Sequence, residues 1–249
     1  MADVGSLWFA EVSDLELPEN RDALVATAEQ HGRRPTLVIH NGDLVPPNSF
    51  YREAAQWFER IYSVNVVGEH DGVEAIPIGL ENGWHRGPAE LAAYGRVTRS
   101  LGDPAAECAR RQRLLFASHR DATNPALRAS LTAALAGRGV PNEQLSRPAY
   151  RERMRGSCFV MSPPGNGVDC HRTWEAIALG AVPVVLRSAL ASTLVDAAPI
   201  VAVTSWEEVL DLTEAELRAL YCEVRSRPPG AATMAYWSVR LGLEVTTNG

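Results

Sequence analysis

The chain contains no lysine, so all 24 of its basic residues are arginine. The absence of lysine excludes Schiff-base chemistry on a lysine amine and a Walker-type phosphate loop, since both need that residue. Acidic residues number 30, and the formal net charge of -6 does not favour binding to nucleic acid or to an anionic membrane. We therefore expect a small-molecule partner and no nucleic acid.

Cysteine is also scarce. The four cysteines, Cys108, Cys158, Cys170 and Cys222, include no CxxC pair, which argues against a zinc site and against a disulfide framework. The N-terminal segment carries acids where a secretory signal is basic, and no apolar run reaches the roughly 18 residues of a membrane-spanning helix. These features predict a cytoplasmic protein with reduced thiols and no membrane span.

What the chain does contain is an alternation of short apolar runs with longer segments of helical period, which predicts an α/β fold. Strands are predicted at 36–43, 113–118, 158–161, 182–186 and 200–203, and helices at 20–31, 49–60, 88–111 and 125–139. A fresh strand follows the charged helix that ends at 111. We therefore predict two small, doubly wound, Rossmann-like domains, 1–111 and 112–249, with the last helix, 231–241, packing back on the first.

One stretch, "SPPGNGVDCHRTWEAIALGAVPVV" (162–185), combines a glycine-bearing loop with a helix start. Asp169 is predicted to cap a helix that ends at Gly180. A helix N-terminus behind such a loop offers free N–H groups to a phosphate or diphosphate, and Arg172 in the first turn adds a bidentate cation. Glu175 lies one turn further along the same face, where its carboxylate can bind both ribose hydroxyls. Together these residues indicate a nucleoside diphosphate.

Two alternatives stay open for this stretch. Arg172 and Glu175 are also typical of an exposed i,i+3 ion pair worth a few tenths of a kcal/mol. An NADP site is less favoured, because Cys170 stands at the third glycine of the dinucleotide fingerprint and the position about twenty residues on is Arg187 rather than an acid. His171 either binds the ligand or, as the alternative, serves only as a structural histidine that makes hydrogen bonds within the protein.

The same stretch resembles the C-terminal signature of exostosin-like glycosyltransferases and related bacterial sugar transferases. The resemblance is strong over 162–185 and weaker over "RLLFASHRDATNPALR" (113–128). It implies the GT-B fold, in which two Rossmann-like domains face a cleft, and a nucleotide-sugar donor bound by the second domain. The donor-binding residues that it implies are Ser118, His119, Gly165, Asn166, Gly167, His171, Arg172 and Glu175.

No DxD motif is present, so we expect metal-independent transfer, without a cofactor, of a sugar to a hydroxyl or amine acceptor. Inversion of configuration is expected, and it needs a base from the first half. Asp43, directly after a strand, is the first candidate, and it is equally typical of a turn residue. Glu69 and His70 are the second candidates. A non-catalytic nucleotide-binding or nucleotide-sugar-binding protein, or an NADP-dependent reductase, remains the alternative.

Overall fold

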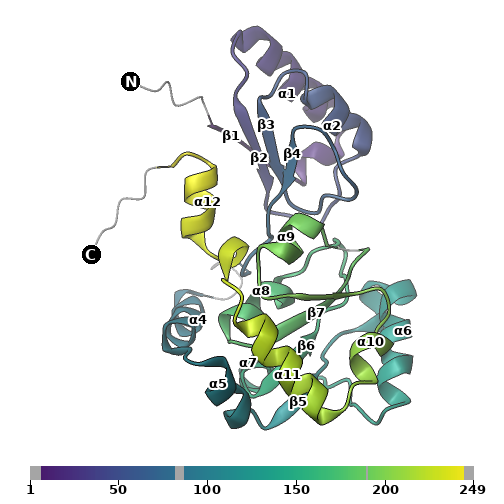
Figure 1. The fold of residues 1–249 in the computed structure, drawn as a ribbon. Coiled ribbons are helices and arrows are strands. Elements are labelled where there is room, and N and C mark those ends of the chain that lie inside the picture. The colour runs from purple at the N-terminus through teal and green to yellow at the C-terminus, as the bar shows by residue number, and fades with distance from the viewer. Residues whose placement is uncertain (1–6, 82–86, 189, 244–249) are drawn as a thin grey trace.

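A computed structural model describes residues 7–81, 87–188 and 190–243, and it contains two four-stranded parallel sheets (Figure 1). The predicted α/β class is confirmed. The first sheet consists of β1 (Leu7–Glu11), β2 (Thr36–His40), β3 (Arg60–Ser63) and β4 (Val73–Ala75). The second consists of β5 (Arg113–Phe116), β6 (Ser157–Met161), β7 (Val182–Leu186) and β8 (Val201–Val203).

The strand order of each sheet follows the chain, β1-β2-β3-β4 and β5-β6-β7-β8. A doubly wound sheet reverses its direction of winding part of the way across, and the described strands show no such reversal. That detail of the prediction is therefore wrong. All of the described strands are parallel, so the loops at the carboxyl ends emerge together at one edge of each sheet.

Helices cover both faces of the second sheet. They are α4 (Pro88–Ser100), α5 (Pro104–Arg110), α6 (Pro125–Ala136), α7 (Arg147–Arg155), α8 (His171–Ala178), α9 (Ser192–Asp196), α10 (Glu207–Leu210) and α11 (Glu214–Arg225). Helices α6, α10 and α11 pack with Phe159, whereas α4, α7 and α8 pack with Val160. Because successive strand residues point to opposite faces, β6 is buried on both sides, and its five residues are all buried.

The first sheet buries one face against α1 (Pro18–His31) and α2 (Asn48–Ala54). Leu37 and Ile39 point into this core, and their neighbours in β2 are half-buried. Gly32 ends α1 in a left-handed conformation, with φ of 70°, as a C-terminal glycine should. The predicted helix 49–60 is too long: α2 ends at Ala54, and Arg60 begins β3, where it pairs with Thr36 of β2. Tertiary strand pairing overrides local helical propensity there.

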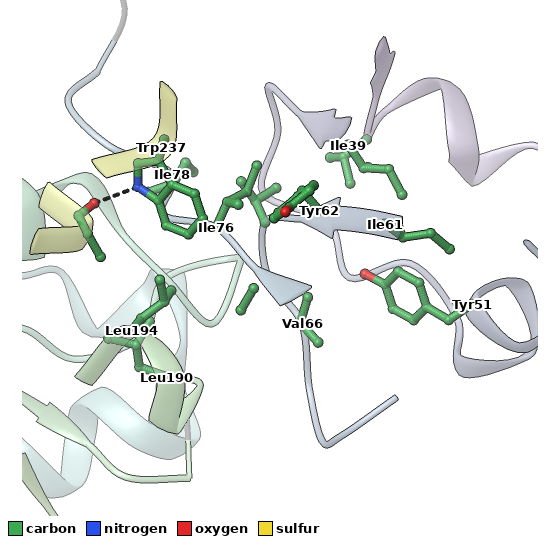
Figure 2. Packing of buried hydrophobic residues seen from close by; sticks show 14 of the residues in the cluster. Ile39, Tyr51, Ile61, Tyr62, Val66, Ile76, Ile78, Leu190, Leu194 and Trp237 are labelled. Carbon is green, nitrogen blue, oxygen red and sulfur yellow. Dashed lines mark hydrogen bonds between the residues drawn. The ribbon is translucent and has the colours of Figure 1, made fainter. Parts of the chain in front are cut away.

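The two halves share one hydrophobic cluster (Figure 2). Ile76 and Ile78, which follow β4, belong to the same cluster as Leu194 in α9 and Leu190 just before it. Helix α12 (Met234–Arg240) also joins this cluster through Trp237, whose ring lies edge-on to Tyr62 at a centroid distance of 6.3 Å. Helix α12 therefore packs against the first sheet.

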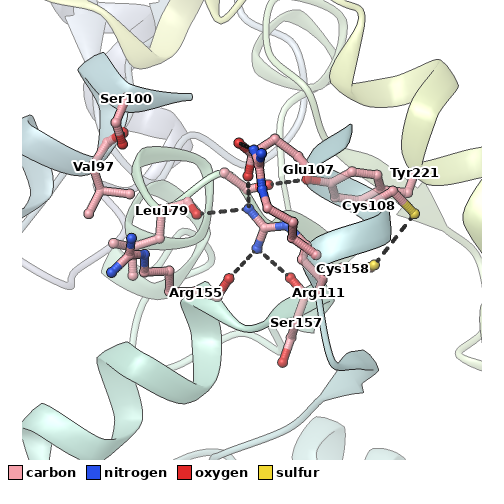
Figure 3. Close-up of polar contacts among 12 residues, drawn as sticks. Val97, Ser100, Glu107, Cys108, Arg111, Arg155, Ser157, Cys158, Leu179 and Tyr221 are labelled. Carbon is pink, nitrogen blue, oxygen red and sulfur yellow. Dashed lines mark hydrogen bonds and ion pairs between the residues drawn. The ribbon is translucent and has the colours of Figure 1, made fainter. Parts of the chain in front are cut away.

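Helices α4 and α5 pack with the second sheet, although they precede residue 112: α4 contacts α8, and α5 contacts α11. Arg111, which follows α5, is buried and reaches across this packing (Figure 3). Its Nη1 donates to the carbonyl oxygens of Arg155 and Ser157 at 2.6 and 2.7 Å, and its Nη2 donates to Leu179 O at 3.1 Å. One guanidinium thus holds the carboxyl ends of α7 and α8 together.

All four cysteines are free thiols. None of the described helices is both long enough and apolar enough to cross a membrane.

Candidate functional site

A cavity of about 420 Å³ lies where the carboxyl-end loops of the two sheets meet. The first sheet contributes Asp43 after β2 and Ile78 after β4, and the second contributes loops after β5 and β6. Its lining includes every predicted donor-binding residue: Ser118, His119, Gly165, Asn166, Gly167, His171, Arg172 and Glu175. Parallel α/β sheets bind ligands at this edge of their strands, and the geometry makes this cavity the candidate site.

Helix α8 begins at the cavity. Strand β6 delivers the chain into the loop 162–170, and the helix starts at His171, with Cys170 as its N-cap. The Cys170 side chain makes no capping hydrogen bond, and in the first turn the backbone N–H of Thr173 donates to Cys170 O at 3.0 Å. No described side chain therefore caps this end of the helix near the cavity. The prediction that Asp169 is the N-cap is wrong by one residue.

The carboxylate of Asp169 is buried and serves another purpose. It accepts hydrogen bonds from the backbone N–H groups of Ile78 and Cys170, at 2.8 and 2.7 Å, and its two oxygens lie 3.0 and 2.8 Å from Nε1 of Trp174. Burial raises the pKa of this carboxyl to about 6, against the opposing effect of these N–H donors. Asp169 therefore ties the loop before α8 to the segment that follows β4.

The two glycines of the loop, Gly165 and Gly167, allow other groups to approach the backbone closely, and the groups nearest to Gly167 belong to the protein itself. A Cβ atom on Gly167 would lie 2.6 Å from both Asn65 Oδ1 and the carbonyl oxygen of Asp43. Neither Gly165 nor Gly167 has a positive φ. Gly167 is therefore explained by the contact between the two halves of the chain.

Arg172 projects into the cavity from the first turn of α8. Its Nε and Nη1 atoms are buried and have no hydrogen-bond partner among the described residues. Burial opposes its charge, yet Tyr150, Cys170 and Glu175 together keep its pKa above the ordinary value. A guanidinium with two buried and unused donor atoms is suited to bind an oxyanion.

A second arginine, Arg128, is buried and lines the same cavity. Its Nε donates to Pro164 O at 2.7 Å and its Nη1 donates to Arg120 O at 3.1 Å, so the side chain is fixed beside the glycine loop. Burial and the charge of Arg172 lower its pKa. Two mutually repelling cations in one cavity favour an anionic ligand.

Our sequence reasoning missed Arg128. The available signal was its position on α6, where Arg128 shares the buried face with Leu131 and Leu135 at spacings of three and seven. A lone arginine on an otherwise apolar helix face is a recognisable exception to the pattern.

Glu175 is 2% exposed, and Tyr150 Oη donates to its Oε2 at 3.5 Å. The exposed Arg–Glu pair considered as an alternative is therefore not what forms, because both side chains line the cavity. Burial raises the pKa of Tyr150, so its hydroxyl stays protonated and can donate. Tyr150, which comes from α7, was also missed.

His119 is 3% exposed and follows β5. Its Nε2 atom lies 2.9 Å from Thr132 Oγ1 and 3.3 Å from Asp121 Oδ1. Burial, reinforced by the charge of Arg172, lowers its pKa to about 4. His119 is therefore neutral at physiological pH. His171 is held differently, since its Nδ1 lies 2.8 Å from Gly79 O and links α8 to the first half.

Of the three candidate bases, Asp43 alone lines the cavity, where its Oδ2 accepts a hydrogen bond of 3.1 Å from Asn166 Nδ2. Glu69 and His70 lie outside the lining. His70 Nε2 is 3.0 Å from Val67 O, and its ring lies 4.9 Å from that of Tyr51. Neither of these two second-choice candidates is therefore placed at the cavity.

The described residues contain no group of three or more histidine, cysteine or acidic side chains arranged to hold a metal ion. A comparison with protein-family models finds no match, and a comparison with curated proteins finds none either.

Proposed function

We propose that the protein is a glycosyltransferase that binds a nucleotide-diphosphate sugar in the cavity between its two sheets, with the two-domain arrangement of the GT-B fold. The observation that carries this proposal is the pair of arginines beside the N-terminus of α8, the buried Arg128 and the half-buried Arg172, whose Nε and Nη1 atoms are buried without a partner among the described residues. Three sources of positive charge converge there, and a diphosphate is the ligand that would use all of them.

Transfer breaks the bond between the anomeric carbon and the diphosphate oxygen, and negative charge develops on the leaving diphosphate. Arg172 and Arg128 are placed to stabilise that charge without a metal ion. The acceptor hydroxyl forms the new bond to the anomeric carbon and gives up its proton. Asp43, which is exposed and lines the cavity beside Asn166, is our candidate to receive it, which makes the transfer inverting.

A dinucleotide fits this cavity less well. Arg187, the basic residue that an NADP site would use, donates from Nη2 to Ala202 O at 2.9 Å and does not line the cavity. The favoured alternative is a non-catalytic protein that binds the same nucleotide.

A thermal-shift screen of UDP, GDP, dTDP, CDP and NADP tests the binding step, because a ligand of the native state raises Tm. We expect one diphosphate to raise Tm and the Arg172→Ala variant to lose that shift. Arg110→Ala is the matched control, since the Arg110 side chain is 64% exposed and lies outside the cavity. A shift with NADP alone, or with no nucleotide, refutes the proposal.

Turnover separates the enzyme from the binding protein. Release of nucleoside diphosphate is measured with the corresponding nucleotide sugars, a panel of hydroxyl and amine acceptors, and EDTA present. We expect Asp43→Asn to abolish release while binding the nucleotide normally. Glu175→Gln should weaken nucleotide affinity by about 1 to 3 kcal/mol; an unchanged affinity would remove Glu175 from the ribose site.

A further inference from the structure

The protonation of the His119 ring can be read from its neighbours. The Thr132 hydroxyl donates to Asp121 Oδ1 at 2.8 Å. Its single hydrogen is then used, so at 2.9 Å from His119 Nε2 the Thr132 oxygen acts as acceptor. A neutral imidazole carries one proton, which therefore sits on Nε2. Nδ1 is left with a lone pair and can only accept.

The ring is held firmly in this orientation. The backbone N–H of His119 donates to Asn142 Oδ1 at 2.9 Å. Its carbonyl oxygen accepts from Asn142 Nδ2 at 3.0 Å and from Gln144 Nε2 at 2.8 Å. The backbone and one ring nitrogen are thus fixed before any ligand arrives.

Nδ1 itself is buried and has no hydrogen-bond partner within the described part of the chain, and His119 is one of the residues that line the cavity. A buried acceptor without a donor is costly, and a ligand that supplies the donor recovers that cost. A phosphate oxygen does not supply it, because a deprotonated phosphate only accepts.

We propose that His119 Nδ1 accepts a hydrogen bond from a hydroxyl group of the ligand, next to the anionic group held by Arg172 and Arg128. The site therefore selects a phosphorylated polyhydroxyl compound over a bare diphosphate. Its identification with a nucleotide sugar rests on the proposed function, and His119 is assigned to the hydroxyl-bearing sugar rather than to the phosphates.

The tautomer is tested without any ligand, by nitrogen NMR of the histidine rings of the wild-type protein at neutral pH. Chemical shifts distinguish a protonated ring nitrogen from a bare one, and a His119→Asn sample assigns the signals. We expect a bare Nδ1 and a protonated Nε2, and we expect Thr132→Val to weaken that preference. A protonated Nδ1 overturns the inference, whatever the protein binds.

Ligand selection is tested by calorimetry with inorganic pyrophosphate, UDP, GDP, UDP-glucose and GDP-mannose on wild type, His119→Phe and His119→Asn. We expect His119→Phe to weaken the nucleotide sugar about tenfold and to leave pyrophosphate within twofold. His119→Asn, which retains an acceptor oxygen near Nδ1, should recover part of the loss.

Equal losses for pyrophosphate and the nucleotide sugar in His119→Phe would place His119 at the phosphates, and no loss for either would remove it from the site. Both results overturn the inference. If the wild type binds no nucleotide at all, the proposed function fails, while the NMR spectrum still decides the tautomer.

Discussion

Oδ2 of Asp169 accepts a hydrogen bond of 2.8 Å from the backbone N–H of Ile78, a residue 91 positions earlier in the chain. The same carboxylate binds the indole N–H of Trp174 in α8. One buried side chain thus joins the segment after β4 to the helix that presents Arg172, and the shape of the cavity depends on it.

Asp169→Asn should destabilise the fold by about 1 to 3 kcal/mol. The amide nitrogen that replaces one carboxylate oxygen cannot accept a hydrogen bond, so the N–H donors that face this oxygen lose their acceptor. Urea unfolding followed by tryptophan fluorescence measures this change. Asp211→Asn is the control, since that carboxylate is 63% exposed and pairs with Arg138; it should change the unfolding free energy by less than about 1 kcal/mol. Equal effects would contradict the role given to Asp169.

Acid should act on His119 and Asp169 in opposite directions. His119 has a pKa of about 4 in the folded state against 6.5 ordinarily, so the unfolded state binds its proton first and stability falls as pH drops from 6.5 to 4. Asp169 has a pKa of about 6 against 3.8 ordinarily, so the folded state binds its proton first and stability rises as pH drops from 6 to 4. Each effect amounts to about 3 kcal/mol.

The two variants should expose these contributions. The unfolding free energies of His119→Asn and Asp169→Asn are measured between pH 7 and 4 and compared with that of the wild type. The other carboxylates titrate in all three proteins, so their contribution cancels in the comparison. Relative to wild type, His119→Asn should gain stability as the pH falls and Asp169→Asn should lose it. Parallel curves for all three proteins would show that neither group titrates as described.

Gly167→Ala should force the two halves apart locally, because the added methyl group meets Asn65 Oδ1 and the Asp43 carbonyl oxygen at 2.6 Å. We expect a loss of about 1 to 3 kcal/mol by calorimetric melting. Gly102→Ala serves as the control, since a Cβ there meets nothing within 4 Å; its Tm should stay near that of wild type. An unchanged Tm in Gly167→Ala would mean that the loops around Gly167 shift to accommodate the methyl group at little cost, which contradicts the prediction.

Arg111→Met should be severe, because it leaves three backbone carbonyl groups, those of Arg155, Ser157 and Leu179, without their side-chain donor. A loss of at least about 3 kcal/mol is expected from denaturant unfolding. Arg110→Met, one residue away on the surface, should cost no more than about 0.5 kcal/mol. Comparable losses would point to a general effect of removing charge from this helix.

The sequence by itself determined the parallel α/β class, the helix that starts behind the loop 162–170, and about half of the residues that line the cavity. These follow from local signals: hydrophobic period, glycine and proline in turns, and the rule that parallel strands end at one edge. Arg172 and Glu175 could be named because three residues along a helix bring side chains to one face.

Tertiary structure alone decided what those residues face. Arg128 and Tyr150 reach the cavity from helices far away in sequence, and Asp43 approaches Asn166 across 123 residues. Only the packed fold brought Asp169 to the backbone N–H of Ile78, placed His70 against Tyr51, and left Nδ1 of His119 without a donor among the described residues. The physical reason is that burial and long-range hydrogen bonding depend on which segments meet, and no local pattern encodes those meetings.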